Sequence, residues 1–269
     1  MPDKLDFKQF KAVFCKISGL NLDSYKDRQM ERRIRQLIVR EGYGSYEQFI
    51  VRLREDPETL HKFFNYLTIN TSGFFRDPKI YDYLQKNALA EMLKRFERIN
   101  VWSMGCSRGE EPYTLAIILS ELSALGRANI LASDFDDQAR SFAREGRYAT
   151  CQLTGVPPHI LKKYFVPHNG GYQISEQLKH SVKFEKHNFL APIYQALPQM
   201  QLVLCRNVFI YFKMEVQDWI VRQLSSKLSP GGFFVTGCAE FVHDPAKFAL
   251  ERKIPAVYQK QSSTGRSYV

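Results

Sequence analysis

The 269-residue sequence lacks the features of a membrane-spanning or secreted protein. No apolar run reaches the roughly 18 residues of a transmembrane helix, and the first residues contain no apolar segment of the signal-peptide type. The cysteines are scattered, and no two have the spacing of a metal or redox motif (Cys15, Cys106, Cys151, Cys205 and Cys238). We therefore expect free thiols in a reducing compartment. This indicates a cytoplasmic protein that holds no metal and does not insert into a membrane.

Acidic residues are also fewer than basic ones, 28 against 38, which gives a formal net charge of +10 at pH 7. This excess favours an acidic partner, which could be nucleic acid, a membrane surface or an acidic protein. Hydrophobic residues make up 44% of the chain and aromatic residues 13%, as in globular proteins. The chain is long enough to bury a sizeable core, as one large domain or two modest ones.

Residues 1–68 carry apolar side chains at helical spacing and predict an all-α N-terminal domain. A helix expected from about Ser24 to Arg40 has one basic face, on which Asp27 and Glu31 are the only acids. The basic residues of this face are Lys26, Arg28, Arg32, Arg33, Arg35 and Arg40. Such a face is usually a solvated helix surface, and the alternative is a docking surface for an acidic partner.

Residues 69–92 are predicted to be a linker with buried aromatic side chains, from which a helix starts at Asp77-Pro78. From residue 93 to 269, short apolar runs alternate with helical patterns, which is typical of an α/β sheet. Between about 164 and 185 the pattern changes to short alternating runs around Asn169-Gly170-Gly171. This stretch predicts a β-hairpin inserted into the α/β domain.

A glycine turn follows the first predicted strand, which runs from Ile99 to Met104. Gly105 and Gly109 form this turn, and a helix comes next. Ligands of open α/β sheets bind outside the carboxyl ends of the strands, so the turn is a candidate site. It lacks the third glycine of dinucleotide sites and the Lys-Ser/Thr pair of phosphate loops. The acids at the start of the helix would repel a pyrophosphate. S-adenosylmethionine, with a nucleoside and a cationic end, fits better, although a purely structural turn is the alternative.

The second predicted strand ends at Asp134, at about the distance from the glycines (roughly 20 residues) at which such folds place an acid that binds ribose. The alternative is a helix N-cap, because Asp136 and Asp137 follow. Later strands end in His187-Asn188-Phe189-Leu190 and in Arg206-Asn207, and we expect both segments to face the ligand.

Three stretches give the chain a resemblance to the CheR family of chemotaxis receptor methyltransferases. They are Asn70-Thr71-Ser72-Gly73-Phe74-Phe75-Arg76, the glycine turn with its Gly-Glu-Glu-Pro-Tyr end, and Cys205-Arg206-Asn207-Val208-Phe209-Ile210-Tyr211-Phe212. The resemblance extends in order over essentially the whole chain. It implies a Rossmann-like S-adenosylmethionine methyltransferase sheet with a small β-hairpin subdomain, preceded by an all-α bundle. It also implies methylation of glutamate side chains on the cytoplasmic helices of chemoreceptors, which gives γ-glutamyl methyl esters and S-adenosylhomocysteine.

The resemblance also implies roles for single residues. The expected cofactor-binding residues are Asn70, Ser72, Arg76, Gly105, Glu111, Asp134, Asn188, Phe189, Arg206 and Asn207. Arg76 and Tyr211 are expected nearest the transferred methyl, as the catalytic residues. The N-terminal domain would dock on the receptor through Lys26, Arg28, Arg32, Arg33 and Arg35. The protein is expected to act as a monomer and to bind no nucleic acid.

The sequence departs from the family pattern in three places. Ser72 replaces the usual threonine and keeps its hydroxyl, Arg108 stands where a threonine is common, and Gln201 replaces an acid. Two other functions are alternatives. A nucleic-acid methyltransferase would suit the positive charge, but Asn188-Phe189-Leu190-Ala191 is not the Asn/Asp-Pro-Pro-aromatic segment of amine methylation. A non-catalytic receptor-binding scaffold is disfavoured by the intact glycine turn.

Overall fold

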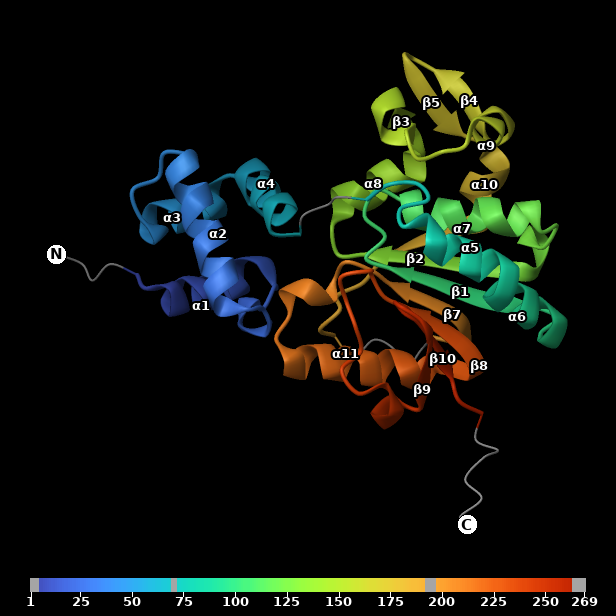
Figure 1. Ribbon diagram of the computed structural model, residues 1–269. Coiled ribbons are helices and arrows are strands. Elements are labelled where there is room, and N and C mark those ends of the chain that lie inside the picture. The colour runs from blue at the N-terminus through green and yellow to red at the C-terminus, as the bar shows by residue number, and fades with distance from the viewer. Residues whose placement is uncertain (1–4, 69–71, 192–196, 263–269) are drawn as a thin grey trace, which may run out of the picture. The chain divides into compact units, whose positions relative to one another are not determined.

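The computed structural model describes residues 5–68, 72–191 and 197–262. The chain forms two compact units (Figure 1). The first comprises Met1–Asn70 and Tyr211–Gln217, and the second comprises Thr71–Ile210 and Asp218–Val269. The chain therefore leaves the second unit after Ile210, adds a short segment to the first, and returns. No helix in the described ranges is long and apolar enough to span a membrane.

Within residues 5–68, four α-helices form the first unit. They are α1 (Phe7–Ser18), α2 (Asp27–Arg40), α3 (Tyr46–Glu55) and α4 (Pro57–Thr68), with a 3₁₀ turn η1 (Leu22–Ser24) before α2. Local sequence sets these boundaries. Asp6 and Gln9 form a capping box at the start of α1, Gly19 ends that helix with a φ of 71°, and the Ser45 side chain caps α3. The expectation of an all-α N-terminal domain is confirmed.

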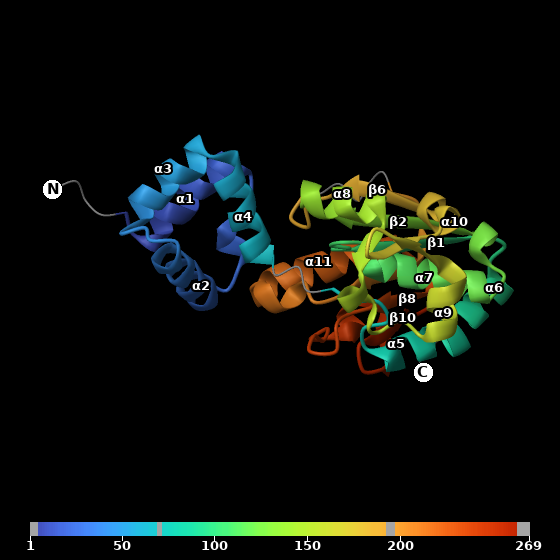
Figure 2. The same cartoon turned by 90° about the horizontal axis from the view of Figure 1, so that it is seen from above.

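Figure 2 shows α1, α2, α3 and α4 arranged around a common centre. Buried aromatic side chains form the core of this unit. Phe63 lies edge-on to Phe14 and Phe49, with ring centroids 5.0 Å apart in each pair. Phe10 lies between these rings and Tyr46. Edge-to-face pairs of this kind add to the stabilisation that burial of the rings provides.

The segment that returns to the first unit pairs with the residues just before α2. Tyr25 and Phe212 form an antiparallel β-bridge, and their ring centroids are 4.7 Å apart. The Lys26 N–H donates to the Tyr211 carbonyl at 3.0 Å. This pairing explains why α2 begins at Asp27, although the sequence predicted a start near residue 24: the intervening residues are extended and bonded to another part of the chain.

An ionic cluster reinforces this pairing. The buried Lys11 ammonium lies 2.6 Å from Asp23 and 2.7 Å from Asp27. Asp27 also pairs with Lys213 at 2.8 Å, and the Lys213 N–H donates to the Ser24 carbonyl at 3.0 Å. Asp27 thus joins α1, α2 and the returning segment.

Asp27 should therefore make the stability of the first unit depend on pH. Its hydrogen bonds to Lys11 and then Lys213 lower the pKa of Asp27. A lowered carboxyl pKa stabilises the folded state above the unfolded-state value of about 4, and this stabilisation is lost as the pH falls through the folded-state pKa. The Asp27 side chain is 47% exposed, so solvent screens the pairs. We expect Asp27→Asn to lower the free energy of unfolding at pH 7 by at most about 1 kcal/mol. Urea unfolding at pH 7 and pH 3 checks this, and an equal difference at both pH values would contradict it.

The second unit is built on a seven-stranded sheet within the described residues, in the order β6-β2-β1-β7-β8-β10-β9. The strands are β1 (Ile99–Met104), β2 (Ala128–Asp134), β6 (Val182–Lys186), β7 (Met200–Cys205), β8 (Leu228–Val235), β9 (Leu250–Ile254) and β10 (Val257–Lys260). The first five strands of this order are parallel, and β10 runs antiparallel to both of its neighbours. The predicted Rossmann-like sheet is confirmed.

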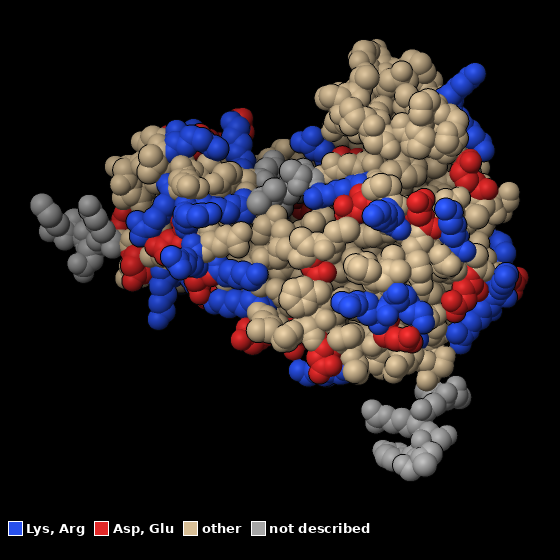
Figure 3. Space-filling model, viewed as in Figure 1, with Lys and Arg blue, Asp and Glu red and all other residues tan. Residues whose placement is uncertain are grey.

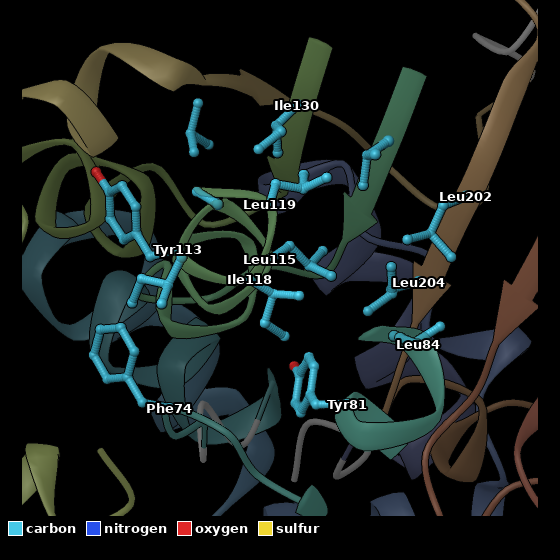
Figure 4. Close-up of a cluster of buried hydrophobic side chains, with 14 of the residues drawn as sticks. Phe74, Tyr81, Leu84, Tyr113, Leu115, Ile118, Leu119, Ile130, Leu202 and Leu204 are labelled. Carbon is cyan, nitrogen blue, oxygen red and sulfur yellow. The ribbon is translucent and has the colours of Figure 1, made fainter. Parts of the chain in front are cut away.

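Helices and apolar side chains cover this sheet. The longer helices are α7 (Glu110–Glu121), α8 (Asp137–Glu145) and α11 (Met214–Lys227), and the short ones are η3 (Leu125–Arg127), η6 (Phe209–Tyr211) and η7 (Pro245–Phe248). Leu115 and Leu119 of α7 belong to the same buried cluster as Ile130 and Leu204 of the strands (Figure 4). The stretch predicted as a linker is helical from Pro78 onwards, in α5 (Pro78–Tyr83), the π-helical η2 (Leu84–Ala88) and α6 (Leu89–Arg95).

A three-stranded antiparallel sheet, ordered β3-β5-β4, is inserted after α8. It consists of β3 (Arg147–Ala149), β4 (Phe165–His168) and β5 (Gly171–Ile174), with η4 (Thr150–Leu153), α9 (Pro158–Tyr164) and α10 (Glu176–Ser181) around it. The hairpin expected at Asn169-Gly170 is confirmed, with φ of 42° and 76° at these residues. The insertion starts at Arg147, earlier than predicted, because β3 is too short to show an alternating pattern. A Cβ on Gly171 would lie 2.5 Å from the Tyr148 carbonyl oxygen, so glycine lets these two strands approach.

Candidate active site

The carboxyl ends of β6, β2, β1 and β7 are neighbours in the sheet, and most of the predicted site residues follow them directly. These are Gly105 after β1, Asp134 at the end of β2, Asn188 and Phe189 after β6, and Arg206 and Asn207 after β7. Parallel strands place such residues along one edge. The fold therefore brings together residues that are far apart in the sequence.

The glycine turn needs glycine at both positions. Gly105 has a φ of 76° and Gly109 a φ of 90°, which other residues rarely adopt. A Cβ on Gly105 would lie 2.9 Å from the Val208 side chain and 3.2 Å from the Phe189 ring. The loops after β6 and β7 therefore approach the turn closely, and Phe189 forms part of its wall.

Asp134 holds this turn in place. Its carboxylate accepts hydrogen bonds from the N–H groups of Ser107 at 2.8 Å and Asp136 at 2.9 Å. Burial raises the pKa of Asp134. The N-cap of α8 is Asp136, which accepts from the N–H groups of Gln138 and Ala139. The helix-cap role considered for Asp134 therefore belongs to Asp136, and each Asp134 oxygen keeps a second lone pair for a ligand.

Arg206 connects the end of β7 to two other parts of the chain. Its side chain is 4% exposed and pairs with Asp77 at 2.6 Å and Glu111 at 3.1 Å. The same guanidinium donates to the Tyr81 hydroxyl at 3.0 Å and the Arg76 carbonyl at 2.9 Å. Two carboxylates thus surround one buried cation, which fixes the segment before α5 against α7.

The two acids that begin α7 have different partners. Glu111 accepts a hydrogen bond from the Ser103 hydroxyl at 2.8 Å in addition to its pair with Arg206. Glu110 is buried and accepts a hydrogen bond from the Ser72 hydroxyl. Burial raises the pKa of both carboxyls, although Arg206 opposes the shift at Glu111. The hydroxyl that Ser72 shares with the family's threonine therefore meets Glu110.

Several residues at this edge hold a left-handed backbone without being glycine. Phe75 and Asp77, which flank Arg76, have φ of 53° and 63°. Ser107 has a φ of 49° and Asn207 a φ of 59°. Such conformations cost of order 1–3 kcal/mol each and persist where the surroundings fix them, as is common at functional sites. Arg76 lies between Phe75 and Asp77, and its side chain is exposed.

Glu240, for which the sequence predicted no role, binds the loops that follow β7 and β8. Its buried carboxylate accepts hydrogen bonds from the N–H groups of Asn207 and Gly237, each at 2.7 Å, and of Ile210 at 3.2 Å. These donors follow β7 and β8, so one side chain holds both strand ends together. A Gly-x-x-Glu pattern after a strand is too short to predict this role. The loop after β7, which Glu240 also binds, is distant in the sequence.

The two remaining departures from the family pattern have structural explanations. The Arg108 guanidinium lies 5.1 Å from the centre of the Phe142 ring on α8, so it packs on the outside of the turn. Gln201 accepts a hydrogen bond from the Asn100 N–H at 2.6 Å and donates to the Ser229 hydroxyl at 2.8 Å. It therefore links β7 to its neighbours on both sides.

Asn70 is outside the described residues. Tyr211 belongs to the first unit, where its carbonyl accepts from Lys26.

The residues expected to dock on a receptor lie on or next to α2, in a unit whose surface carries many basic side chains (Figure 3). Lys26, Arg28, Arg32 and Arg35 are exposed. Arg35 pairs with Glu31 at 2.8 Å. Arg33 is half-buried and turned toward α4.

The turn fits a nucleoside-containing cofactor. The Ser107 hydroxyl is buried and has no hydrogen-bond partner among the described residues, so a donor and acceptor is available at the turn. Gly105 has no side chain, so a ligand can approach its backbone closely. The Asp134 oxygens have spare lone pairs, and the Phe189 ring provides an apolar wall. These groups match ribose hydroxyls and an adenine face.

Comparison with known proteins identifies the family. Residues 5–68 match the family model "CheR methyltransferase, all-alpha domain", and residues 70–255 match "CheR methyltransferase, SAM binding domain". The chain belongs to the CheR methyltransferase family. It is a methyltransferase, and its cofactor is S-adenosylmethionine.

Relatives of similar length support this assignment. The chemotaxis protein methyltransferase of Listeria innocua is 32% identical over 252 residues, which cover 93% of this chain and 95% of the relative. Chemotaxis protein methyltransferase 2 of Pseudomonas aeruginosa is 31% identical over 247 residues, covering 88% and 87%. The Escherichia coli chemotaxis protein methyltransferase is 31% identical over 255 residues, covering 91% and 87%. The similarity thus includes both units of this CheR protein.

Asp134 should be required for cofactor affinity. A hydrogen bond to a charged acceptor contributes about 1.5–3 kcal/mol, so Asp134→Ala should raise the dissociation constant of S-adenosylmethionine at least about tenfold. Isothermal titration calorimetry measures this constant. Asp136→Ala is the control, because it removes the α8 cap and should lower stability by about 1 kcal/mol without changing the constant. An unchanged constant for Asp134→Ala would show that this carboxylate serves only the protein backbone.

Proposed function

We propose that this CheR-family protein methylates glutamate side chains on the cytoplasmic helices of chemoreceptors and releases γ-glutamyl methyl esters and S-adenosylhomocysteine. The relatives named as chemotaxis protein methyltransferases support the receptor as substrate. In this proposal the protein is a cytoplasmic monomer that binds no nucleic acid and does not insert into a membrane.

The carboxylates of the site are bound to other groups of the protein. Asp134 accepts two backbone N–H groups, Glu240 accepts three, and Glu111 pairs with Arg206. Glu110 accepts from Ser72, and Asp77 pairs with Arg206. In the described part of the site, each of these five carboxylates already accepts a hydrogen bond or an ion pair from the protein, so each has a structural role. This favours an acceptor that is already ionised.

A glutamate side chain is such an acceptor. Its reference pKa is about 4.3, so at neutral pH it needs no residue to remove a proton. S-adenosylmethionine, when bound, supplies an electrophilic methyl group on a positively charged sulfur. The protein then has only to hold the carboxylate in line with that methyl, and positioning of this kind can provide about 7–11 kcal/mol. The ester is uncharged, so a pocket of low dielectric does not oppose its formation.

Arg76 and Tyr211 are the proposed catalytic residues. The exposed Arg76 guanidinium would orient the acceptor carboxylate, while the Arg206 bond to its carbonyl holds the Arg76 backbone. The Tyr211 hydroxyl would donate a hydrogen bond close to the methyl. A tight ion pair with Arg76 would weaken the nucleophile, so its role is to position the acceptor.

The direct test is incubation with labelled S-adenosylmethionine and a chemoreceptor cytoplasmic fragment. We expect label in the fragment that base treatment releases as methanol. Replacement of the fragment's methylation-site glutamates by alanine should abolish the label, and duplex DNA or RNA should take up none. Base-stable label, or label in nucleic acid, would contradict the proposal. Binding of S-adenosylmethionine without transfer to any receptor fragment would favour a scaffold.

Receptor docking should depend on the exposed arginines of α2. The described residues provide no ion-pair partner for Arg28 or Arg32, whereas Arg35 pairs with Glu31. Surface charges act mainly on association rate and are screened over roughly 8 Å at physiological salt. Reversal of Arg28 and Arg32 to Glu should slow receptor methylation severalfold at low salt, and added salt should slow the wild type. The dissociation constant of S-adenosylmethionine should not change.

The matched control reverses Lys16 and Arg54, two exposed residues on α1 and α3, and changes the net charge by the same amount. It should leave the methylation rate near that of the wild type. Equal slowing by both pairs would show that net charge, and not the α2 surface, governs docking.

A further inference from the structure

Two basic residues of α2, Arg33 and Arg40, contact the Tyr66 ring of α4, and Arg33 also donates hydrogen bonds to backbone carbonyls there. The Arg33 guanidinium donates to the Leu67 carbonyl at 3.3 Å and to the Tyr66 carbonyl. The guanidinium carbon lies 5.1 Å from the centre of the Tyr66 ring, and the Tyr66 hydroxyl donates back to the Arg33 carbonyl at 2.9 Å. Arg33 is therefore bound to the last turn of α4.

The same guanidinium also reaches the returning segment. Its central carbon lies 5.9 Å from the centre of the Tyr211 ring, within the range of a cation–π contact. The backbone of this segment is held by the bond from Lys26 to the Tyr211 carbonyl and by the bridge between Tyr25 and Phe212. Arg33 therefore contacts both the Tyr211 ring and the end of α4.

These contacts require the shape of arginine. Carbonyls at a helix C-terminus carry partial negative charge and favour a cation. A planar guanidinium can donate to two carbonyls and at the same time present its face to aromatic rings, whereas a lysine ammonium is a point charge with no flat surface. A residue that only had to attract an acidic receptor would not need this geometry.

We propose that Arg33 is a positioning residue for methyl transfer rather than a receptor-docking residue. It holds the Tyr211 ring against the end of α4. The inference rests on the proposed function, in which Tyr211 donates a hydrogen bond near the transferred methyl. Arg28 and Arg32 provide the docking charge, and Arg33 keeps the tyrosine in place.

The two roles predict different kinetics. In steady-state methylation of a receptor fragment, Arg33→Ala should lower kcat about tenfold or more and leave the KM for the receptor within about twofold. Arg33→Lys keeps the charge but not the planar contacts, so its kcat should also fall, at least about threefold. Arg32→Ala, at the neighbouring exposed position, is the matched control and should raise the receptor KM with kcat unchanged.

Hydrogen exchange gives a measurement that does not depend on activity. The amides of Lys26 and Lys213 are bonded to the Tyr211 and Ser24 carbonyls. Loss of the Arg33 contacts should speed their exchange severalfold in Arg33→Ala, and Arg32→Ala should not.

Two results would overturn the inference. One is an Arg33→Ala or Arg33→Lys variant with an unchanged kcat, whatever happens to the receptor KM. The other is wild-type exchange at both amides of Arg33→Ala. If the wild-type protein does not methylate any receptor fragment, the proposed function fails instead, and the exchange data still decide whether Arg33 holds the Tyr211 segment.

Discussion

The buried Arg206 cation joins three parts of the second unit. Arg206 lies at the end of β7, and its carboxylate partners Asp77 and Glu111 come from the segment before α5 and from the first turn of α7. Removing one partner of a buried pair costs about 3–5 kcal/mol, so these three parts of the chain cannot separate independently. Glu111 also accepts a hydrogen bond from Ser103 in β1, which extends the network to the strand that carries the glycine turn.

Around this network, backbone conformations that are unfavourable by themselves are fixed by side chains from other loops. Ser107 donates its N–H to Asp134, and Asn207 donates its N–H to Glu240. Both donors have positive φ, as does Asp77 beside Arg206. The strain is tolerated because buried carboxylates satisfy the N–H groups that it exposes. The glycine turn and the loop after β7 are therefore held by the protein's own side chains.

The first unit combines two uses of one helix. The outer side of α2 carries exposed arginines that suit an acidic receptor helix, while Asp27 and Arg33 hold the segment that carries Tyr211. In the proposed function, the docking charge and the contacts that hold Tyr211 therefore belong to the same helix. A receptor that binds α2 would do so beside the residues that fix this tyrosine.

The sequence by itself determined the class of fold and the place of the cofactor turn. Apolar periodicity predicted the helical first unit and the alternating second unit. Gly105 and Gly109 indicated the turn, because glycine is the residue that tolerates a positive φ and close packing at these positions. The sequence did not predict the short strand β3, because three residues are too few to show an alternating pattern. Whether Asp134 or Asp136 caps α8 was open until the fold showed which carboxylate faces the helix N–H groups. Sequence grouped Arg33 with the other cations of its helix, and it could not place Glu240. The contacts of both residues lie with segments distant in the chain, and only tertiary packing decides which distant groups meet a side chain.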